Sequence, residues 1–233
     1  EYPVINSLVL LGEKSNKYKE QIKKIILSKE KDSFIKTNIS RDVELIKKLY
    51  SSVGYNLVTV DTKISELDNN NKVDLIFEIK RGEVTKISKI IFTGDKKIRE
   101  KRLRDIIASE EDKFWKFISR NTKFSQRLVN LDLRLLTNYY KSLGYYDVQI
   151  TSNSAEIKKS GNVELTYSIE AGNRYIIKKI STNVDPVFDK EIFLPLNKEY
   201  QKVIGEYYSP FKVKTLLEDI DNLIEQKNLQ FVE

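Results

Sequence analysis

Residues 135–150 read LLTNYYKSLGYYDVQI, and residues 45–60, which lie 90 positions earlier, read LIKKLYSSVGYNLVTV. In both stretches, apolar residues spaced three and four apart lead to a glycine-tyrosine pair, at Gly144 and Gly54. That spacing is typical of one face of an α-helix, and glycine is the favoured residue just after a helix end. The two stretches therefore predict two equivalent helices, each followed by a strand.

A third copy aligns when Asn228 takes the place of the glycine, and asparagine is the next best residue at a helix end. Counting back 4, 5, 8, 11 and 15 positions from each pair gives only apolar or aromatic residues, which form one helical stripe. The three sets are Tyr50, Leu49, Ile46, Val43 and Ile39; Tyr140, Tyr139, Leu136, Leu133 and Val129; and Ile224, Leu223, Ile220, Leu217 and Val213.

Strand signals surround these helices. Turn-forming stretches at 68–71 and 159–162 separate two strands and predict a β-hairpin in each of the first two copies. An earlier strand ends at Gly12 and at Gly94, and Ile177 and Ile180 take the equivalent places in the third copy. The clearest alternation of apolar residues lies in the last strand of each hairpin, at Val73, Leu75, Phe77 and Ile79, and at Val163, Leu165, Tyr167 and Ile169.

A first helix lies between the early strand and the main helix, so the repeating unit is β-α-α-β-β and the fold class is α+β. Its apolar residues are Tyr18, Ile22, Ile25 and Ile26 in one copy and Ile98, Leu103, Ile106 and Ile107 in the next. We expect units at 1–82 and 83–172 and a partial, truncated unit at 173–233. The links between units are only a few residues long, which predicts an elongated string of small domains with limited hinges.

The composition excludes several classes of function. The chain has no Cys and no His, so disulfides, Cys/His zinc sites, thiol nucleophiles and imidazole bases are all impossible. No apolar run approaches the roughly 20 residues of a membrane-spanning helix. We therefore expect no enzyme, no catalytic or metal site and no cofactor, and a soluble fragment of a longer protein.

The formal net charge of +7 raises the question of nucleic-acid binding. Most of the basic residues are Lys rather than Arg, which is the residue favoured for bidentate phosphate and base recognition. A KH-like module is the alternative from another class, because it also combines paired helices with a three-stranded sheet. It requires a GXXG loop, and the glycines stand at 12, 54, 82, 94, 144, 161, 172 and 205, with no two of them three apart. We therefore expect no nucleic-acid partner.

The order and spacing of three motifs resemble the POTRA repeats of BamA-type outer-membrane assembly factors. These motifs are the strand that closes on Gly94-Asp95, the helix that runs into Tyr139-Tyr140 and then Gly144, and the last strand that ends at Glu170-Ala171-Gly172. The insertion around residues 114–121 resembles one that is typical of the third unit. The chain is thus similar to units two, three and part of four of that family. Other POTRA-bearing secretion or import pores are the alternative within the same class.

The resemblance implies three-stranded sheets with two helices on one face, the third strand central and the second at the edge. It also implies a periplasmic arm at the outer membrane, followed by a C-terminal β-barrel in the full-length chain. Its expected partners are unfolded outer-membrane protein precursors and accessory assembly lipoproteins, and no enzymatic activity is expected.

An edge strand exposes unpaired main-chain N–H and C=O groups, which an extended partner strand can complete by β-augmentation. The predicted edges cover residues 57–62 and 147–152, neither of which contains Pro. The candidate binding residues are Leu57, Val58, Thr59, Val60, Asp147, Val148, Gln149 and Ile150.

Three further groups of residues have both a binding and a structural interpretation. Trp115 and Phe117 are either a partner anchor or a cap on the core of their own unit. The aromatic residues around Tyr140 and Tyr145 have the spacing of core residues rather than of a base-stacking platform. The acidic residues 110–112 are interpreted as a solvated loop or helix end.

Overall fold

A computed structural model describes residues 2–67, 71–113, 121–154, 161–181, 183, 186–187 and 189–226 of the chain. Trp115 and Phe117 lie outside these residues. None of the helices in these ranges combines the length and the apolar character that crossing a bilayer requires.

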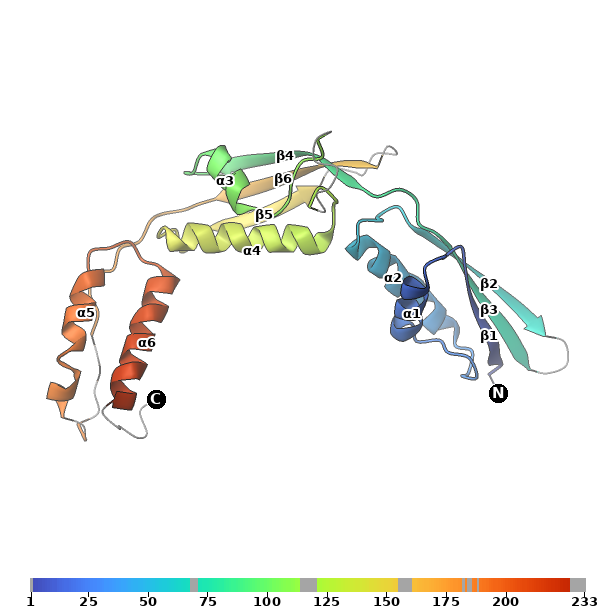
Figure 1. The fold of residues 1–233 in the computed structure, drawn as a ribbon, viewed down its shortest axis with the longest axis horizontal. Helices are drawn as coiled ribbons and strands as arrows, with labels where there is room; N and C mark the ends of the chain where they lie inside the picture. Colours follow the sequence, from blue (N-terminus) through green and yellow to red (C-terminus); the bar gives the residue numbers. More distant parts are fainter. Residues whose placement is uncertain are drawn as a thin grey trace. The chain divides into compact units, whose positions relative to one another are not determined.

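The first repeat contains β1 (Val4–Leu11), α1 (Asn16–Ile25), α2 (Lys36–Ser52), β2 (Thr59–Leu67) and β3 (Lys72–Lys80). The strands form one sheet in the order β1-β3-β2, in which β3 is parallel to β1 and antiparallel to β2. Both helices lie on the same face of this sheet (Figure 1). The predicted order of elements and the antiparallel hairpin are confirmed.

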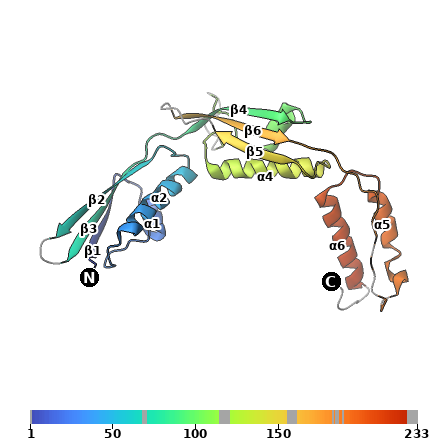
Figure 2. The ribbon, with the colours of Figure 1, turned by 180° about the vertical axis from the view of Figure 1, so that it is seen from behind.

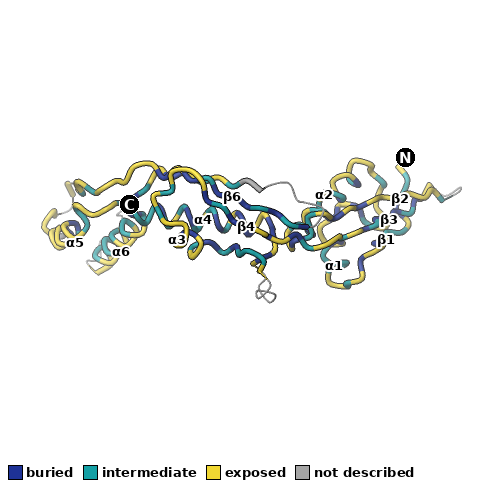
Figure 3. The backbone as a smooth tube through the Cα atoms, turned by 90° about the horizontal axis from the view of Figure 1, so that it is seen from above, coloured by how far each residue is buried: buried dark blue, intermediate teal, exposed yellow. Residues whose placement is uncertain are grey.

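The core of the first repeat lies between the central strand and the two helices. Every second residue of β3 is buried, which Figure 3 shows as alternating colours, and the main helix buries Ile39, Ile46 and Tyr50 against it. These residues belong to the predicted stripes. The reason is geometric. Side chains that recur every second residue on a strand, or every 3.6 residues on a helix, lie on one face, so both sets point into the layer between the sheet and the helices.

The second repeat contains β4 (Lys86–Asp95), α3 (Glu100–Ile106), α4 (Gln126–Ser142), β5 (Gln149–Ser154) and β6 (Asn162–Glu170). Its sheet has the same order, β4-β6-β5, with the last strand central (Figure 2). The equivalent side chains are again buried: Val129, Leu136 and Tyr140 on the helix, and Val163, Leu165, Tyr167 and Ile169 on the strand.

The third repeat contains the 3₁₀ turn η1 (Lys190–Phe193), α5 (Leu196–Val203) and α6 (Pro210–Gln226). The sequence predicted a first strand at Ile177–Ile180, and this prediction is wrong, because the structure gives that segment no strand. A first strand of this fold pairs in parallel with the central strand, and no central strand occurs among the described residues of this repeat. Residues 177–180 therefore lack the partner that would make them a strand.

One pair of main-chain hydrogen bonds recurs in all three repeats, and we call it the clamp. It joins the start of the first strand to the loop that precedes the main helix. In the third repeat, the same two bonds hold the segment at Ile177 in the position that the first strand has in the other repeats, although this segment forms no strand. The N–H to C=O pairs are Phe34 to Pro3 and Ile5 to Asp32; Phe124 to Thr85 and Ile87 to Thr122; and Tyr208 to Tyr175 and Ile177 to Glu206, all between 2.7 and 2.9 Å.

By packing, the chain divides into two compact units. One contains residues 1–90, 108–130 and 154–165, and the other contains residues 91–107, 131–153 and 166–233. This division passes through β4, α4, β5 and β6 and does not follow the repeat, so the unit boundaries after residues 82 and 172 stay a prediction.

Candidate functional site at the sheet edges

One edge of the first sheet is covered by the chain itself. The loop that follows α1 runs along the N-terminal half of β1, where the N–H of Ile5 donates to Asp32 C=O at 2.9 Å and the N–H of Lys31 donates to Ile5 C=O at 2.7 Å. The Glu30 carboxylate adds a further acceptor for the N–H of Leu8 at 3.1 Å. This edge therefore has few main-chain groups left for a partner.

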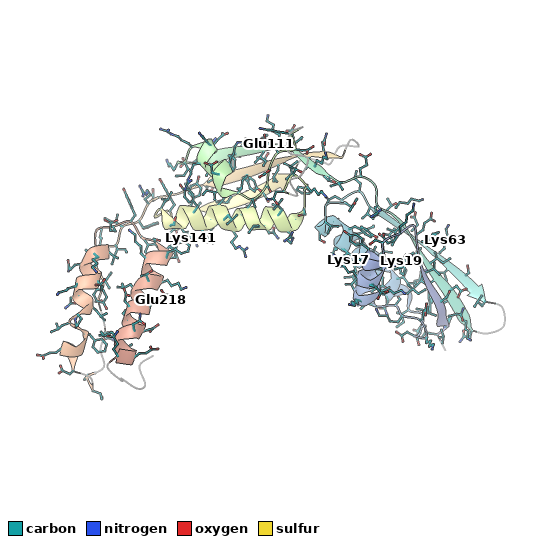
Figure 4. All side chains as sticks on the ribbon, viewed as in Figure 1. Lys17, Lys19, Lys63, Glu111, Lys141 and Glu218 are labelled. Atoms are coloured by element: carbon teal, nitrogen blue, oxygen red, sulfur yellow. The ribbon has the colours of Figure 1, made fainter. Side chains whose placement is uncertain are left out.

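The equivalent edge of the second sheet is covered in the same way. The N–H of Ile87 donates to Thr122 C=O at 2.8 Å, and the N–H of Asp112 donates to Ile87 C=O at 2.7 Å. Glu111 Oε1 accepts the N–H of Ile90 at 3.0 Å, and Figure 4 labels Glu111 beside β4. The acidic residues 110–112 do lie in a loop, as interpreted, but Glu111 is not merely solvated, because its carboxylate accepts a main-chain N–H of the edge strand β4.

The opposite edges are formed by β2 and β5, and no loop among the described residues covers them. In the described part of the chain, residues of β2 and β5 make main-chain hydrogen bonds only within their own sheets. Figure 1 shows β2 at the outer side of its sheet. A strand placed like this offers a row of N–H and C=O groups along one side. The candidate site is therefore this pair of strands, which we call the free edges.

The free edges begin two residues later than predicted. Thr59, Val60, Gln149 and Ile150 lie in β2 or β5. The strands do not include Leu57, Val58, Asp147 and Val148, so the predicted place of these residues in an edge strand is wrong, while their role in binding stays a prediction. The cause is a turn after each helix, which directs the side chains of Val58 and Val148 into the core, where each is only 8% exposed.

The first free edge carries a lysine in its middle, because β2 extends to Leu67. Lys63 Nζ lies 2.9 Å from the Glu78 carboxylate on the neighbouring strand, and Figure 4 labels Lys63 on β2. This hydrogen bond and the opposite charge raise the pKa of Lys63 and lower the pKa of Glu78. A charged lysine is a common device for discouraging strand addition. Residues 149–154 of the second free edge read QITSNS and contain no charge and no Pro.

The tyrosines of the second repeat serve its packing. Tyr140 is fully buried and donates its hydroxyl hydrogen to Lys96 C=O. The guanidinium of Arg102 lies 5.2 Å from the ring centroid of Tyr139. Tyr146 is half exposed, and its ring meets Tyr208 edge to face at 5.3 Å. Burial of Tyr140 agrees with the core interpretation of the helical stripe.

Sequence reasoning missed two buried carboxylates, Asp42 and Asp132, which stand 90 positions apart and are 0% exposed. Asp42 accepts main-chain N–H groups from the loop after α1, and Asp132 accepts the hydroxyl hydrogen of Tyr167. The signal was present, because an acidic residue recurs at the same repeat position, directly before an apolar residue of the helical stripe. Among the described residues, no three or more carboxylates gather where they could hold a metal ion.

A family model matches two stretches of the chain. It is POTRA, described as a surface antigen variable number repeat, and it matches residues 3–82 and 85–172. Among solved structures, the chain is similar to POTRA3-5 of Haemophilus influenzae BamA. That match has a TM-score of 0.50 and 15% identity, and it covers 94% of this chain and 85% of that one.

Curated relatives include the outer membrane protein assembly factor BamA of Neisseria meningitidis. It is 24% identical over 230 residues, which are 95% of this chain and 28% of that protein. BamA of Neorickettsia risticii is 24% identical over 181 residues, which are 78% of this chain and 24% of that protein. The chain thus spans about a quarter of the length of these relatives.

Proposed function

Because this chain belongs to the POTRA family, we propose that it is part of the periplasmic scaffold of an outer-membrane protein assembly factor. In this role, its free edges receive extended segments of unfolded outer-membrane proteins by β-augmentation. The same proposal includes the docking of accessory lipoproteins and the attachment to a C-terminal barrel. Only the resemblance to the family supports these two parts.

One observation supports this function above the others, namely the asymmetry of each sheet. The chain covers the β1 and β4 edges with its own loops, while β2 and β5 bond only inward among the described residues. A purely structural sheet needs no such difference between its edges. A receptor for strands does, because one edge must stay free while the other is blocked against uncontrolled pairing.

Main-chain recognition matches the chemistry of the proposed client. The N–H and C=O groups of an extended segment are the same whatever its sequence, so a free edge binds many different strands. Specificity then comes from alternate side chains, because one face of the added strand continues the helix-covered face of the sheet. A client with apolar residues at every second position fits this requirement.

Of the two free edges, β5 is the better receptor. Its residues are uncharged, whereas β2 holds Lys63 in an ion pair with Glu78 across its middle. A strand that pairs with β2 therefore has to lie next to the ammonium group of Lys63 and the carboxylate of Glu78. We therefore place the first client contact at residues 149–154.

The test uses two neighbouring proline variants, Thr151→Pro and Ser152→Pro. Successive residues of a strand direct their N–H groups to opposite sides, so one of these N–H groups faces β6 and the other faces the free edge. The variant that loses the inward N–H should lower the unfolding temperature. The variant that loses the outward N–H should keep the unfolding temperature of the parent and bind a labelled, extended outer-membrane strand peptide at least about tenfold more weakly.

The comparison between the two variants contains its own control, since thermal unfolding identifies which residue faces inward. Val148→Pro is not suitable, because Val148 is buried and precedes the strand. Unchanged peptide binding by the stably folded variant would overturn the proposed function at this edge.

A further inference from the structure

A cavity of about 320 Å³ lies at the C-terminal end of α2, within the first compact unit. It is bounded by Tyr18 of α1, by residues 52–55 at and just after the end of α2, and by the segment 121–128 that leads into α4. Its volume is at the lower end of the range of small-ligand sites, so it accommodates a single side chain and its main chain rather than a folded element.

The cavity carries positive charge that the described chain does not balance. Lys123 and Arg127 both line it, and both are exposed. None of its described lining residues is acidic, and neither cation forms an ion pair with a carboxylate in the described part of the chain. Two such cations favour an anionic ligand, and a planar guanidinium can donate two parallel hydrogen bonds to one carboxylate.

A second wall of the cavity offers hydrogen-bond acceptors. Ser52 is the last residue of α2, Val53 follows it, and both line the cavity. The last C=O groups of a helix have no partner inside the helix and carry partial negative charge. This wall disfavours a doubly charged phosphate and favours an N–H donor. A ligand that joins a single negative charge to a nearby N–H fits both walls, and an acidic residue of a peptide chain is such a ligand.

The cavity also offers apolar surface, which comes from Val53 and Leu128. The side chain of Val53 is 38% exposed, so part of this surface is open to a ligand. A short peptide with an apolar residue on each side of the acidic one therefore gains contact area that a bare anion lacks.

The same place in the second compact unit can be identified by its glycine. The C=O groups of Gly54 and Gly144 each accept the N–H of the clamp residue that begins the next strand segment, at 2.8 and 2.9 Å. A Cβ added to Gly54 would lie 3.3 Å from the Cβ of Lys123, and a Cβ added to Gly144 would lie 3.1 Å from the Cβ of Tyr207. Lys123 and Tyr207 therefore hold equivalent positions.

In the second unit, the chain supplies its own cation at this place. The guanidinium carbon of Arg174 lies 3.3 Å from the ring centroid of Tyr207, and its Nε donates to Leu143 C=O, at the end of α4, at 2.8 Å. The residue equivalent to Arg174 in the first unit is Val84, which carries no charge. The cavity at the end of α2 is thus a property of its own residues and not a requirement of the repeat.

We propose that this cavity binds an acidic residue of a peptide segment. The carboxylate lies between Arg127 and Lys123, and the main-chain N–H of the same residue points to the end of α2. No residue of β2 or β5 is among the described lining residues, so the site is separate from the free edges and does not depend on the proposed function.

The probe is the tripeptide acetyl-Leu-Glu-Leu-amide, titrated into the isotope-labelled 233-residue protein. It should shift the amide signals of residues 52–55 and 123–128 saturably. The matched peptide acetyl-Leu-Gln-Leu-amide should bind at least about tenfold more weakly, because it lacks the charge. Acetate should also bind at least about tenfold more weakly than the glutamate peptide, because it has neither the N–H nor the apolar side chains.

Two variants of the protein give a matched comparison on one helix. Arg127 and Arg134 both lie on α4 and are both exposed, but only Arg127 lines the cavity. Arg127→Gln should weaken binding of the glutamate peptide several-fold, and Arg134→Gln should leave it unchanged. Both variants remove one positive charge, and both should keep the unfolding temperature of the parent because neither side chain is buried.

Several results would overturn the proposal. One is the absence of saturable shifts at residues 52–55 and 123–128, and another is equal binding of the glutamine peptide. Equal weakening by the two arginine variants would assign the effect to net charge. Acetate that binds as tightly as the glutamate peptide would reduce the cavity to a site for any small anion. Shifts that appear only in β2 or β5 would assign the peptide to the free edges.

Discussion

Asp42 on α2 accepts the main-chain N–H of Ser28, 14 positions earlier, at 3.0 Å. The same carboxylate accepts the N–H of Leu27 at 2.5 Å, so one fully buried side chain holds the loop that leaves α1. That loop continues into the residues that cover the β1 edge. The buried aspartate thus links the main helix of the repeat to the closure of one sheet edge.

Replacing this carboxylate should destabilise the first repeat. Asp42→Ala leaves two main-chain donors without their acceptor, and an unsatisfied buried donor costs about 1–3 kcal/mol. We expect a loss of about 2–4 kcal/mol, measured by hydrogen exchange of the buried β3 amides, which report local opening. Asp61→Ala on exposed β2 is the control and should cost less than about 1 kcal/mol. Equal losses in the two variants would contradict the role of Asp42.

The stability of the first repeat should also depend on acid pH through Glu13. Burial of Glu13 favours a higher pKa, but hydrogen bonds from the Tyr50 hydroxyl and the Ser15 N–H, together with the charge of Arg81, hold its pKa below the ordinary value of 4.5. A lowered folded-state pKa contributes stability above the ordinary value, and this contribution is lost as the pH falls through the lowered pKa.

We therefore expect Glu13→Gln to be less stable than the parent by about 2 kcal/mol at pH 7, the size of hydrogen bonds to a charged group. The difference should shrink as the pH is lowered from about 4.5, because the parent then loses the same carboxylate. Denaturation of both proteins at a series of pH values measures this. A difference that is independent of pH would show that the charge of Glu13 plays no part.

Gly12 cannot accept a side chain, for two separable reasons. Its φ is +85°, and an added Cβ would lie 2.3 Å from the main-chain oxygen of Ile79. Gly205 has a similar φ of +86°, but an added Cβ would meet nothing within 4 Å. Gly205→Ala should therefore cost only the conformational penalty of about 1–2 kcal/mol.

Gly12→Ala should cost at least about 2 kcal/mol more than Gly205→Ala, because the main chain of β3 must also move. The exchange of the buried amides in each variant's own repeat gives the two values. Similar losses would mean that the φ value alone determines the requirement for glycine.

Lys63 should limit strand binding at the first free edge. Lys63→Thr removes the ammonium group from the middle of β2 and should raise peptide binding at this edge several-fold, with little change in stability because the ion pair is exposed. Lys80→Thr is the matched control, since it removes an exposed lysine from β3 that also lies near Glu78. A similar gain in both variants would assign the effect to net charge rather than to the edge.

The elements could be predicted to the extent that their signal is periodic. The stripes that contain Tyr50 and Tyr140 predicted α2 and α4, because a helix repeats its face every three or four residues. The starts of β2 and β5 could not be placed as well. An apolar residue such as Val58 or Val148 fits a half-buried strand, but it also fits a turn that directs its side chain into the core, and the sequence does not separate the two cases. The segment after Ile176 carries a strand pattern but pairs with no strand in the described chain.

Local pattern alone determined the order β-α-α-β-β, its repetition and the helix faces, because these depend on residues close together in the chain. Which sheet edge is covered was decided only by the tertiary structure. Glu30 and Leu8, or Glu111 and Ile90, are about 20 residues apart, and no periodicity records that a carboxylate reaches a main-chain N–H across a loop. Edges are properties of pairing between distant strands, so they become visible only when the chain is folded.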